Sequence, residues 1–164
     1  MKNPKPDFLA ILHTLVEHRV DFLVVGGICA VLHGAPIATF DLDLVHSRHA
    51  DNIQRLMAAL EVLEAHYRAR KDLKPDVSHL SSPGHQLLLT CFGPLDILGE
   101  IGKGRGYGEL LRDSVEIEIG PETKIRLLSL EALIRIKQET ARDKDRAMLA
   151  ILRRTFEEKS KGKC

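Results

Sequence analysis

Apolar positions along the chain recur with two different periods, and each period predicts one kind of element. Helical spacing of apolar residues is found in the stretches 7–19, 50–66, 130–139 and about 142–157. Short apolar or alternating runs, bounded by glycine, proline and polar residues, predict strands at 22–25, 41–43, 86–92, 95–98, 114–119 and 124–128. Helices and strands are therefore mixed along the chain, which indicates an α/β protein.

Polar and turn-forming residues predict where several elements begin and end. Asp7 and Ser129 stand immediately before helical patterns, so we expect both to be N-caps. Gly93-Pro94 is expected to turn the chain between two strands. The polar stretch 68–84 carries two prolines and predicts a long connection, with at most a short strand at Val77–Leu80.

Length and composition favour one globular domain. The 164 residues are 44% hydrophobic and 29% charged, which are ordinary values for such a domain. We expect a single domain over residues 1–152 and a basic, flexible C-terminal tail over residues 153–164. No stretch approaches the roughly 20 apolar residues that a membrane helix needs, so we expect no membrane contact and a cytoplasmic location.

The spacing of the cysteines and the distribution of charge indicate which kinds of site and partner to expect. The three cysteines are widely spaced and provide neither a disulfide framework nor a CxxC zinc site. Residues 1–120 carry 12 basic and 16 acidic side chains, net −4, whereas residues 121–164 carry 12 and 7, net +5. A basic C-terminal part suits contact with phosphate or RNA, and the same charges also suit solvated helix faces.

Three acidic residues are candidates for chemistry. Side chains alternate between the faces of a strand, so Asp41 and Asp43 project from the same face. Two neighbouring carboxylates repel each other unless a cation lies between them, and Mg²⁺ is held by one or two carboxylates together with substrate phosphates. Asp96 lies inside the apolar run 95–98, where it needs a partner or a metal ion.

A glycine pair precedes these acids. Gly26-Gly27 follows the strand 22–25 and leads into a short helix that we expect at Ile28–His33. Unpaired backbone N–H groups at such a junction favour an anion, and glycine lets a phosphate come close. Room for phosphate beside a metal site indicates nucleotide chemistry.

Two connections carry further basic residues. The loop 99–108 lacks the residue order of a P-loop, and we expect it to be flexible, with Lys103 and Arg105 over the face that carries the acids. Arg68 belongs to a small basic cluster that extends to Lys74. We expect this cluster to be a solvated loop, with contact to a nucleic-acid backbone as the alternative.

The order of these features resembles the signature of the nucleotidyltransferase superfamily, the fold of DNA polymerase β. Its parts here are Val25-Gly26-Gly27, thirteen intervening residues and then Asp41-Leu42-Asp43-Leu44. The stretch SLEALIRIKQETARDKDRAML, residues 129–149, is similar to a tail motif of bacterial members, including toxin-antitoxin and abortive-infection proteins. The resemblance implies an α/β (α+β) nucleotidyltransferase fold with a mixed, largely antiparallel sheet flanked by helices.

The resemblance also implies a role for each motif residue. Asp41, Asp43 and Asp96 would be catalytic and would hold two Mg²⁺ ions, for which Mn²⁺ can substitute; Glu100 is the second choice for the third acid. The nucleotide-binding set would be Gly26, Gly27, Thr39, Lys137, Arg142 and Lys144. Alternatives are a plain strand residue for Thr39 and paired surface charges for the tail residues. Many bacterial members carry arginine where this chain has Ile37.

The function implied by the resemblance is Mg²⁺-dependent transfer of an NMP from an NTP onto a hydroxyl group. Bacterial relatives imply RNA, such as the 3′ end of tRNA, or a protein as the acceptor, and a cognate antitoxin or toxin as a partner. Two other classes stay open. One is a non-catalytic nucleotide-binding or interaction module that kept the fold, and Ile37 in place of the usual arginine favours it. The other is a metal-dependent phosphohydrolase, which also uses clustered acids.

Overall fold

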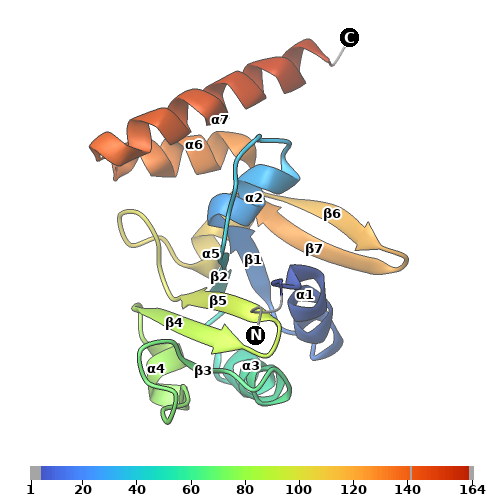
Figure 1. The fold of residues 1–164 in the computed structure, drawn as a ribbon, viewed down its shortest axis with the longest axis vertical. Helices are drawn as coiled ribbons and strands as arrows, with labels where there is room; N and C mark the ends of the chain where they lie inside the picture. Colours follow the sequence, from blue (N-terminus) through green and yellow to red (C-terminus); the bar gives the residue numbers. More distant parts are fainter. Residues whose placement is uncertain (1–4, 141, 163–164) are drawn as a thin grey trace.

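A mixed sheet runs through the described part of the molecule and has seven strands (Figure 1). The computed structural model describes residues 5–140 and 142–162. Across the sheet the strands follow in the order β3 (His66–Tyr67), β4 (His85–Thr90), β5 (Gly93–Leu98), β2 (Leu42–His46), β1 (Phe22–Val25), β7 (Thr123–Leu128) and β6 (Ser114–Gly120). Neighbours are antiparallel except for the parallel pairs β2/β5 and β1/β7. The predicted fold class, with a mixed and largely antiparallel sheet, is confirmed.

Helices pack on the sheet and extend the molecule at both ends (Figure 1). They are α1 (Phe8–Glu17), α2 (Gly26–Leu32), α3 (Ala50–Val62), α4 (Val77–Ser81), α5 (Tyr107–Leu110) with the 3-10 turn η1 (Leu111–Asp113), α6 (Leu130–Glu139) and α7 (Asp143–Lys161). At one end α6 packs against α7 and α2, and at the other end α3 packs against α4. The sheet with α2 thus lies between two helical ends.

Two predicted N-caps are present. The Asp7 carboxylate accepts a hydrogen bond from the N–H of Ala10 at 3.0 Å and begins α1. The Ser129 hydroxyl accepts one from the N–H of Ala132 at 3.2 Å and begins α6. Each such bond satisfies a helix N–H that has no partner inside the helix, and is worth about 1 kcal/mol.

The central strands bury one face and leave acids on the other. Leu42 and Leu44 of β2 and Leu95 and Ile97 of β5 are fully buried. Because side chains alternate along a strand, Asp43 and Asp96 project from the opposite face. A one-residue slip would move the leucines out of the core, so the hydrophobic pattern also determines where the acids lie.

The segment at 77–80, where at most a short strand was expected, is instead helical. Asp76 precedes it and accepts a hydrogen bond from the N–H of His79 at 2.8 Å, while the His79 ring accepts one from the N–H of Asp76. This reciprocal cap begins α4, and Leu80 turns into the core.

The expected turn at Gly93-Pro94 is also misplaced. Both residues belong to β5 and pair with Thr90 and Leu89. The turn lies one step earlier, at Cys91-Phe92, where the Thr90 hydroxyl accepts a hydrogen bond from the N–H of Phe92 at 3.1 Å. Gly93 has φ 126°, which suits glycine and lets the chain re-enter the sheet.

The boundary expected at residue 152 falls inside α7, which continues to Lys161. Leu152 and Thr155 are buried, and Phe156 packs against the core. Near the C-terminal end, Lys159 Nζ donates to His33 Nδ1 at 3.0 Å. A buried stripe therefore holds residues 153–161 in a helix where a flexible tail was expected. None of the helices in the described part of the chain is long and apolar enough to span a membrane.

Candidate functional site

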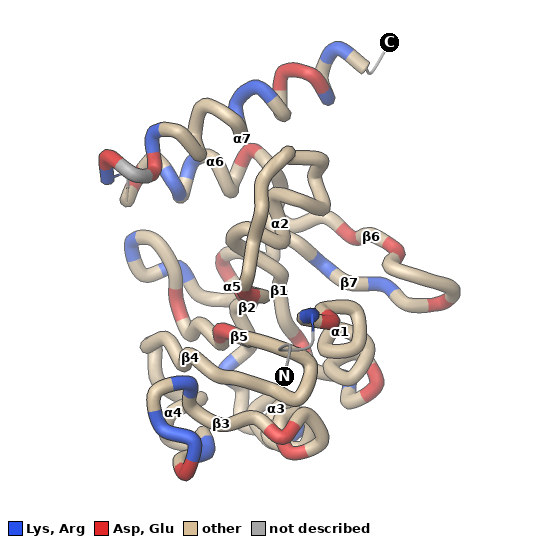
Figure 2. Tube along the Cα trace, viewed as in Figure 1, with Lys and Arg blue, Asp and Glu red and all other residues tan. Residues whose placement is uncertain are grey.

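Register places two of the predicted acids side by side. Asp43 on β2 lies opposite Asp96 on the parallel strand β5, and Val25, the last residue of β1, lies opposite Asp43 on the other side. Adjacent strands are about 4.8 Å apart, so the two carboxyl groups share one patch of the sheet surface. The two strands are neighbours in the middle of the sheet although they are far apart in the sequence, and Figure 2 shows acidic positions along them.

The Asp43 carboxyl group is strongly perturbed. Burial raises its pKa most, followed by a hydrogen bond with Asp96 and by the negative charges of Asp96 and Asp41, so that the pKa reaches about 7. The positive charge of Arg68 acts in the opposite direction. The cause is physical: a buried carboxylate beside other acids ionises less readily unless a cation lies close by.

Asp41 lies one residue before β2, at the entrance to the strand that was expected to contain it. Its side chain is half-buried, and its charge is close enough to raise the pKa of Asp43. The structure thus brings the three predicted acids into one region, with Asp43 and Asp96 in direct contact.

The glycine pair lies against the side chains of this region. Gly26 begins α2 directly after β1, two residues earlier than expected, with φ 67°. A Cβ atom at Gly26 would lie 2.2 Å from Asp43 Oδ2, and one at Gly27 would lie 2.5 Å from Thr39 Oγ1. Both contacts are impossibly short. The two glycines therefore make room for Asp43 and Thr39, a role that the sequence does not reveal.

Arg68 is a site residue that sequence reasoning missed. It follows the two-residue strand β3, and its Nη2 donates to Asp96 Oδ1 at 2.7 Å and to the Leu88 carbonyl at 3.0 Å. Its expected place was a solvated loop. The only signal in the sequence was that Asp96, inside an apolar strand, needs a partner. Nothing in the sequence points to a residue 28 positions earlier.

Comparison with known proteins supports the fold. No protein-family model and no curated protein matches the chain. Among solved structures, the lincosamide antibiotic adenylyltransferase LnuA with bound lincomycin matches with a TM-score of 0.59 and 16% identity over 89% of this chain and 94% of that one. A Thermotoga maritima protein described as a candidate nucleotidyltransferase matches with a TM-score of 0.56 and 16% identity over 87% and 88%.

This chain has the nucleotidyltransferase fold. The match runs over most of both chains. At 16% identity the likeness concerns the fold. The chemistry must be argued from the side chains of this chain.

The nucleotidyltransferase fold also brings a distant lysine to the glycine pair. Lys137 on α6 lines a small cavity of about 60 Å³ together with Gly26 and Gly27, and apolar side chains of α6 and α7 complete the walls. Its Nζ lies 3.3 Å from Asp145 Oδ1. The lysine is thus 110 positions away from Gly27 in the sequence but lines the same cavity.

The other two predicted basic residues are placed differently. Arg142 is exposed at the N-cap of α7, where its backbone N–H donates to Asp145 Oδ2 at 2.9 Å. None of the hydrogen bonds and ion pairs among the described residues joins Arg142 to the acids or the glycine pair. Lys144 lies in the first turn of α7, and its side chain lies outside the described part of the structure.

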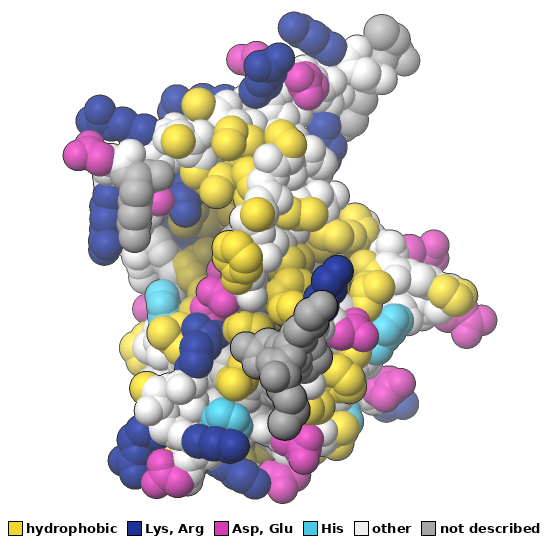
Figure 3. Space-filling view, in the orientation of Figure 1, with side chains coloured by type: hydrophobic (Ala, Val, Ile, Leu, Met, Phe, Trp, Pro, Cys, Tyr) yellow, Lys and Arg dark blue, Asp and Glu magenta, His cyan; other side chains and the backbone are white. Residues whose placement is uncertain are grey.

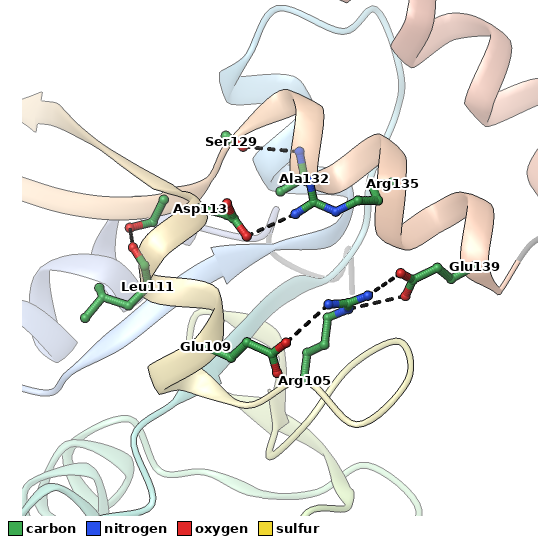
Figure 4. Close-up of polar contacts among 9 residues, drawn as sticks. Arg105, Glu109, Leu111, Asp113, Ser129, Ala132, Arg135 and Glu139 are labelled. Carbon is green, nitrogen blue, oxygen red and sulfur yellow. Dashed lines mark hydrogen bonds and ion pairs between the residues drawn. The ribbon is translucent and has the colours of Figure 1, made fainter.

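The loop between β5 and α5 is held in place, in contrast to the flexible loop that we expected. The Arg105 guanidinium lies between Glu109 and Glu139, with Nε 3.3 Å from Glu139 Oε2 and Nη1 3.3 Å from Glu109 Oε1 (Figure 4). Glu100, the second choice for the third acid, pairs with Arg48 at 2.8 Å. Arg105 and Glu100 are therefore used to fix the loop to α6 and to the body.

A hollow lies between the α6–α7 end and the rest of the molecule (Figure 3). Hydrophobic side chains line it, and acidic and basic side chains stand at its border (Figure 3). Such a concave surface with a few charged groups is the usual form of a ligand site.

The donor set fits a divalent cation. Asp43 and Asp96 present oxygen ligands in contact with each other, and a cation would offset the burial and the neighbouring negative charges that raise the pKa of Asp43. Mg²⁺ needs one or two carboxylates besides water and phosphate oxygens. Within the described residues, no three acidic, histidine or cysteine side chains are already arranged as a complete metal site. Asp41 would have to turn toward the pair to become a third ligand.

Proposed function

We propose that this chain is a divalent-metal-dependent nucleotidyltransferase, which moves a nucleoside monophosphate from an NTP onto a hydroxyl group. The observation that carries the proposal is the contact between Asp43 and Asp96 beside Gly26. At this contact, a pair of carboxylates that needs a cation lies next to a stretch of backbone without side chains. The fold of the adenylyltransferase LnuA supports the same activity.

Each group would act through charge and position. Asp41, Asp43 and Asp96 would hold two Mg²⁺ ions, which supply charge neutralisation and a lowered pKa of the acceptor hydroxyl. The acceptor hydroxyl would give its proton to solvent and its oxygen would bond to the α-phosphorus, while the bond from that phosphorus to pyrophosphate breaks and pyrophosphate leaves. The backbone at Gly26-Gly27 would bind the β- and γ-phosphates, and Lys137 would balance their charge. Arg142 and Lys144 remain proposed contacts at the start of α7.

The acceptor is the finer part of the proposal. An RNA end or a protein hydroxyl suits the exposed basic side chains of α7, among them Arg146, Arg153 and Arg154. Phe40, which precedes Asp41 and is 77% exposed, offers a flat apolar surface for a base or an acceptor ring. A small hydroxyl compound is the second candidate acceptor, because LnuA is an antibiotic adenylyltransferase. A toxin-antitoxin setting would supply a cognate partner protein.

The test is transfer of label from each α-³²P-labelled NTP with Mg²⁺ or Mn²⁺. Total RNA, cell protein and a panel of hydroxylated small molecules serve as acceptors. We expect the wild-type chain to label one acceptor class and Asp43→Asn to lose at least 10²-fold in rate, because the paired carboxylate is needed to hold the cation. Asp72→Asn, a change at an exposed acid paired with Arg70, is the matched control and should be fully active.

The outcomes separate the three functional classes. Full transfer by a folded Asp43→Asn variant would contradict the proposed mechanism. Nucleotide binding without transfer to any acceptor would favour a non-catalytic module. The observation that favours a non-catalytic module is the half-buried Ile37, which packs against the core. Many bacterial members of the superfamily that the sequence resembles have an arginine at this position. Release of free nucleotide without a labelled acceptor would favour a phosphohydrolase.

A further inference from the structure

We propose that Arg68 is a built-in counter-ion of the metal site, which occupies Asp96 in the metal-free protein and must give way when a divalent cation binds. Arg68 would thereby lower the affinity of the site for a divalent cation that binds without nucleotide. This inference rests on the proposed function, because it assumes that Asp43 and Asp96 hold the cation.

The position of Arg68 is set by backbone pairing and not by chance contact. Tyr67 of β3 pairs with Leu88 of β4, and the N–H of Arg68 donates to the Leu87 carbonyl at 3.0 Å. Leu87 in turn lies opposite Asp96 in the register of β4 and β5. The row from Arg68 across Leu87 to Asp96 and Asp43 thus lies on one face of the sheet.

The Arg68 guanidinium group forms an ion pair with the Asp96 carboxylate. Its Nη2 lies 2.7 Å from Asp96 Oδ1 and 3.0 Å from the Leu88 carbonyl oxygen, so the group is fixed at the edge of β4. The Asp96 side chain is only 12% exposed, whereas that of Arg68 is 35% exposed. Asp96 is therefore enclosed, and Arg68 has a solvent side into which it can move.

Two kinds of cation would compete for one carboxyl group. Asp96 already bonds to Arg68 with one oxygen and also forms a hydrogen bond with the Asp43 carboxyl group. A divalent cation that binds between the acids meets the repulsion of a guanidinium that already bonds to the same carboxylate. Arg68 therefore stabilises the metal-free state and weakens binding of metal alone.

The nearby basic side chains do not take this role. Arg70 pairs with Asp72 at 2.9 Å, and Lys74 pairs with Glu61 at 3.6 Å, both at exposed positions. Arg70 carries the same charge as Arg68 on the same loop but has a different partner, which makes it a matched control.

The experiment is a titration of the full chain with Mn²⁺ alone, with free Mn²⁺ followed by electron paramagnetic resonance. Arg68→Gln should bind Mn²⁺ about tenfold more tightly than wild type, because the cation no longer competes with a guanidinium. Arg68→Lys keeps a charge and should stay within about threefold of wild type, and Arg70→Gln should be unchanged. Thermal unfolding in EDTA checks that each variant is folded; Arg68→Gln should melt at a lower temperature there and gain more from Mn²⁺ than wild type does.

The outcomes distinguish the two proposals. Equal or weaker Mn²⁺ binding by Arg68→Gln, with binding by wild type intact, would overturn the role of Arg68 and leave the metal-dependent function standing. Absence of Mn²⁺ binding in the wild type and in every variant would overturn both. Loss of binding in Asp43→Asn confirms that the ion is measured at the proposed site.

Discussion

At the scale of single residues, the site depends on one close approach. The Asp43 carboxylate lies over the backbone of Gly26, where a Cβ atom would come within 2.2 Å of Oδ2 and 3.0 Å of Cγ. Gly26 also has a positive φ, which L-residues rarely adopt. One residue thus provides two conditions at once: the turn from β1 into α2, and the space for the acid.

Replacement of Gly26 by alanine should lower the free energy of unfolding by about 2–4 kcal/mol, through backbone strain and the clash with Asp43. It should also abolish transfer, because the carboxylate must move. Urea unfolding checks the first effect and the labelled-NTP assay the second. Gly108→Ala is the control, since a Cβ there meets no atom within 4 Å, and it should change stability by less than about 0.5 kcal/mol. An equal cost in an Asp43→Ala background would show that the clash is not the cause.

At the scale of elements, the end of α7 is tied to α2. His33, the C-cap of α2, lies between two partners: its Nε2 donates to the Leu128 carbonyl at 2.8 Å, and its Nδ1 accepts from Lys159 at 3.0 Å. The bond from Lys159 requires the neutral imidazole, because only an unprotonated Nδ1 can accept. Burial lowers the pKa of His33 most, the Leu128 carbonyl opposes this, and the charge of Lys159 lowers it further.

The free energy of unfolding should therefore depend on pH through His33. Its folded pKa lies below the unfolded value of about 6.5, so the unfolded chain binds more protons at acidic pH. This contribution is fully present above pH 6.5 and is lost as the pH falls through the lowered folded pKa. Urea unfolding between pH 5 and 8 should show a shallower rise with pH in His33→Gln than in wild type. The difference between the two curves of unfolding free energy against pH removes the contribution of the other titratable groups. Parallel curves would contradict the role of His33.

At the scale of the whole molecule, sheet and helices enclose one core, and of the described cysteines one lies inside it and one outside. Cys29 on α2 is fully buried, and burial raises the pKa of its thiol to about 12. Its Sγ donates to the Leu128 carbonyl at 3.2 Å. Cys91 is exposed at the turn between β4 and β5, and Cys164 lies outside the described residues.

Thiol labelling should thus report global unfolding. In a Cys164→Ser background, Cys91 should react quickly with a disulfide reagent, and Cys29 should react orders of magnitude more slowly, because its thiolate forms only when the core opens. The rate at Cys29 should rise with urea in parallel with global unfolding. Comparable rates at both cysteines in buffer would show that α2 opens independently of the sheet.

Much of the architecture was predictable because local rules decided it. The N-caps Asp7 and Ser129 and the alternation of Leu42, Asp43 and Leu44 are properties of a few neighbouring residues. The errors have local causes too. Asp76 and His79 form a cap that makes a helix of a short apolar segment, and the buried stripe of α7 extends beyond the expected boundary.

The sequence by itself determined the order of a glycine pair and two acids around the start of a strand, because alternation and spacing act within one stretch of chain. Only the tertiary structure decided that Asp96 lies beside Asp43, that Arg68 pairs with Asp96 and that Lys137 reaches the glycines. Those neighbours come from strand order and helix packing between distant segments. The same long-range packing explains why Gly26 has no side chain, since the atom that would clash belongs to a strand 17 residues further along the chain.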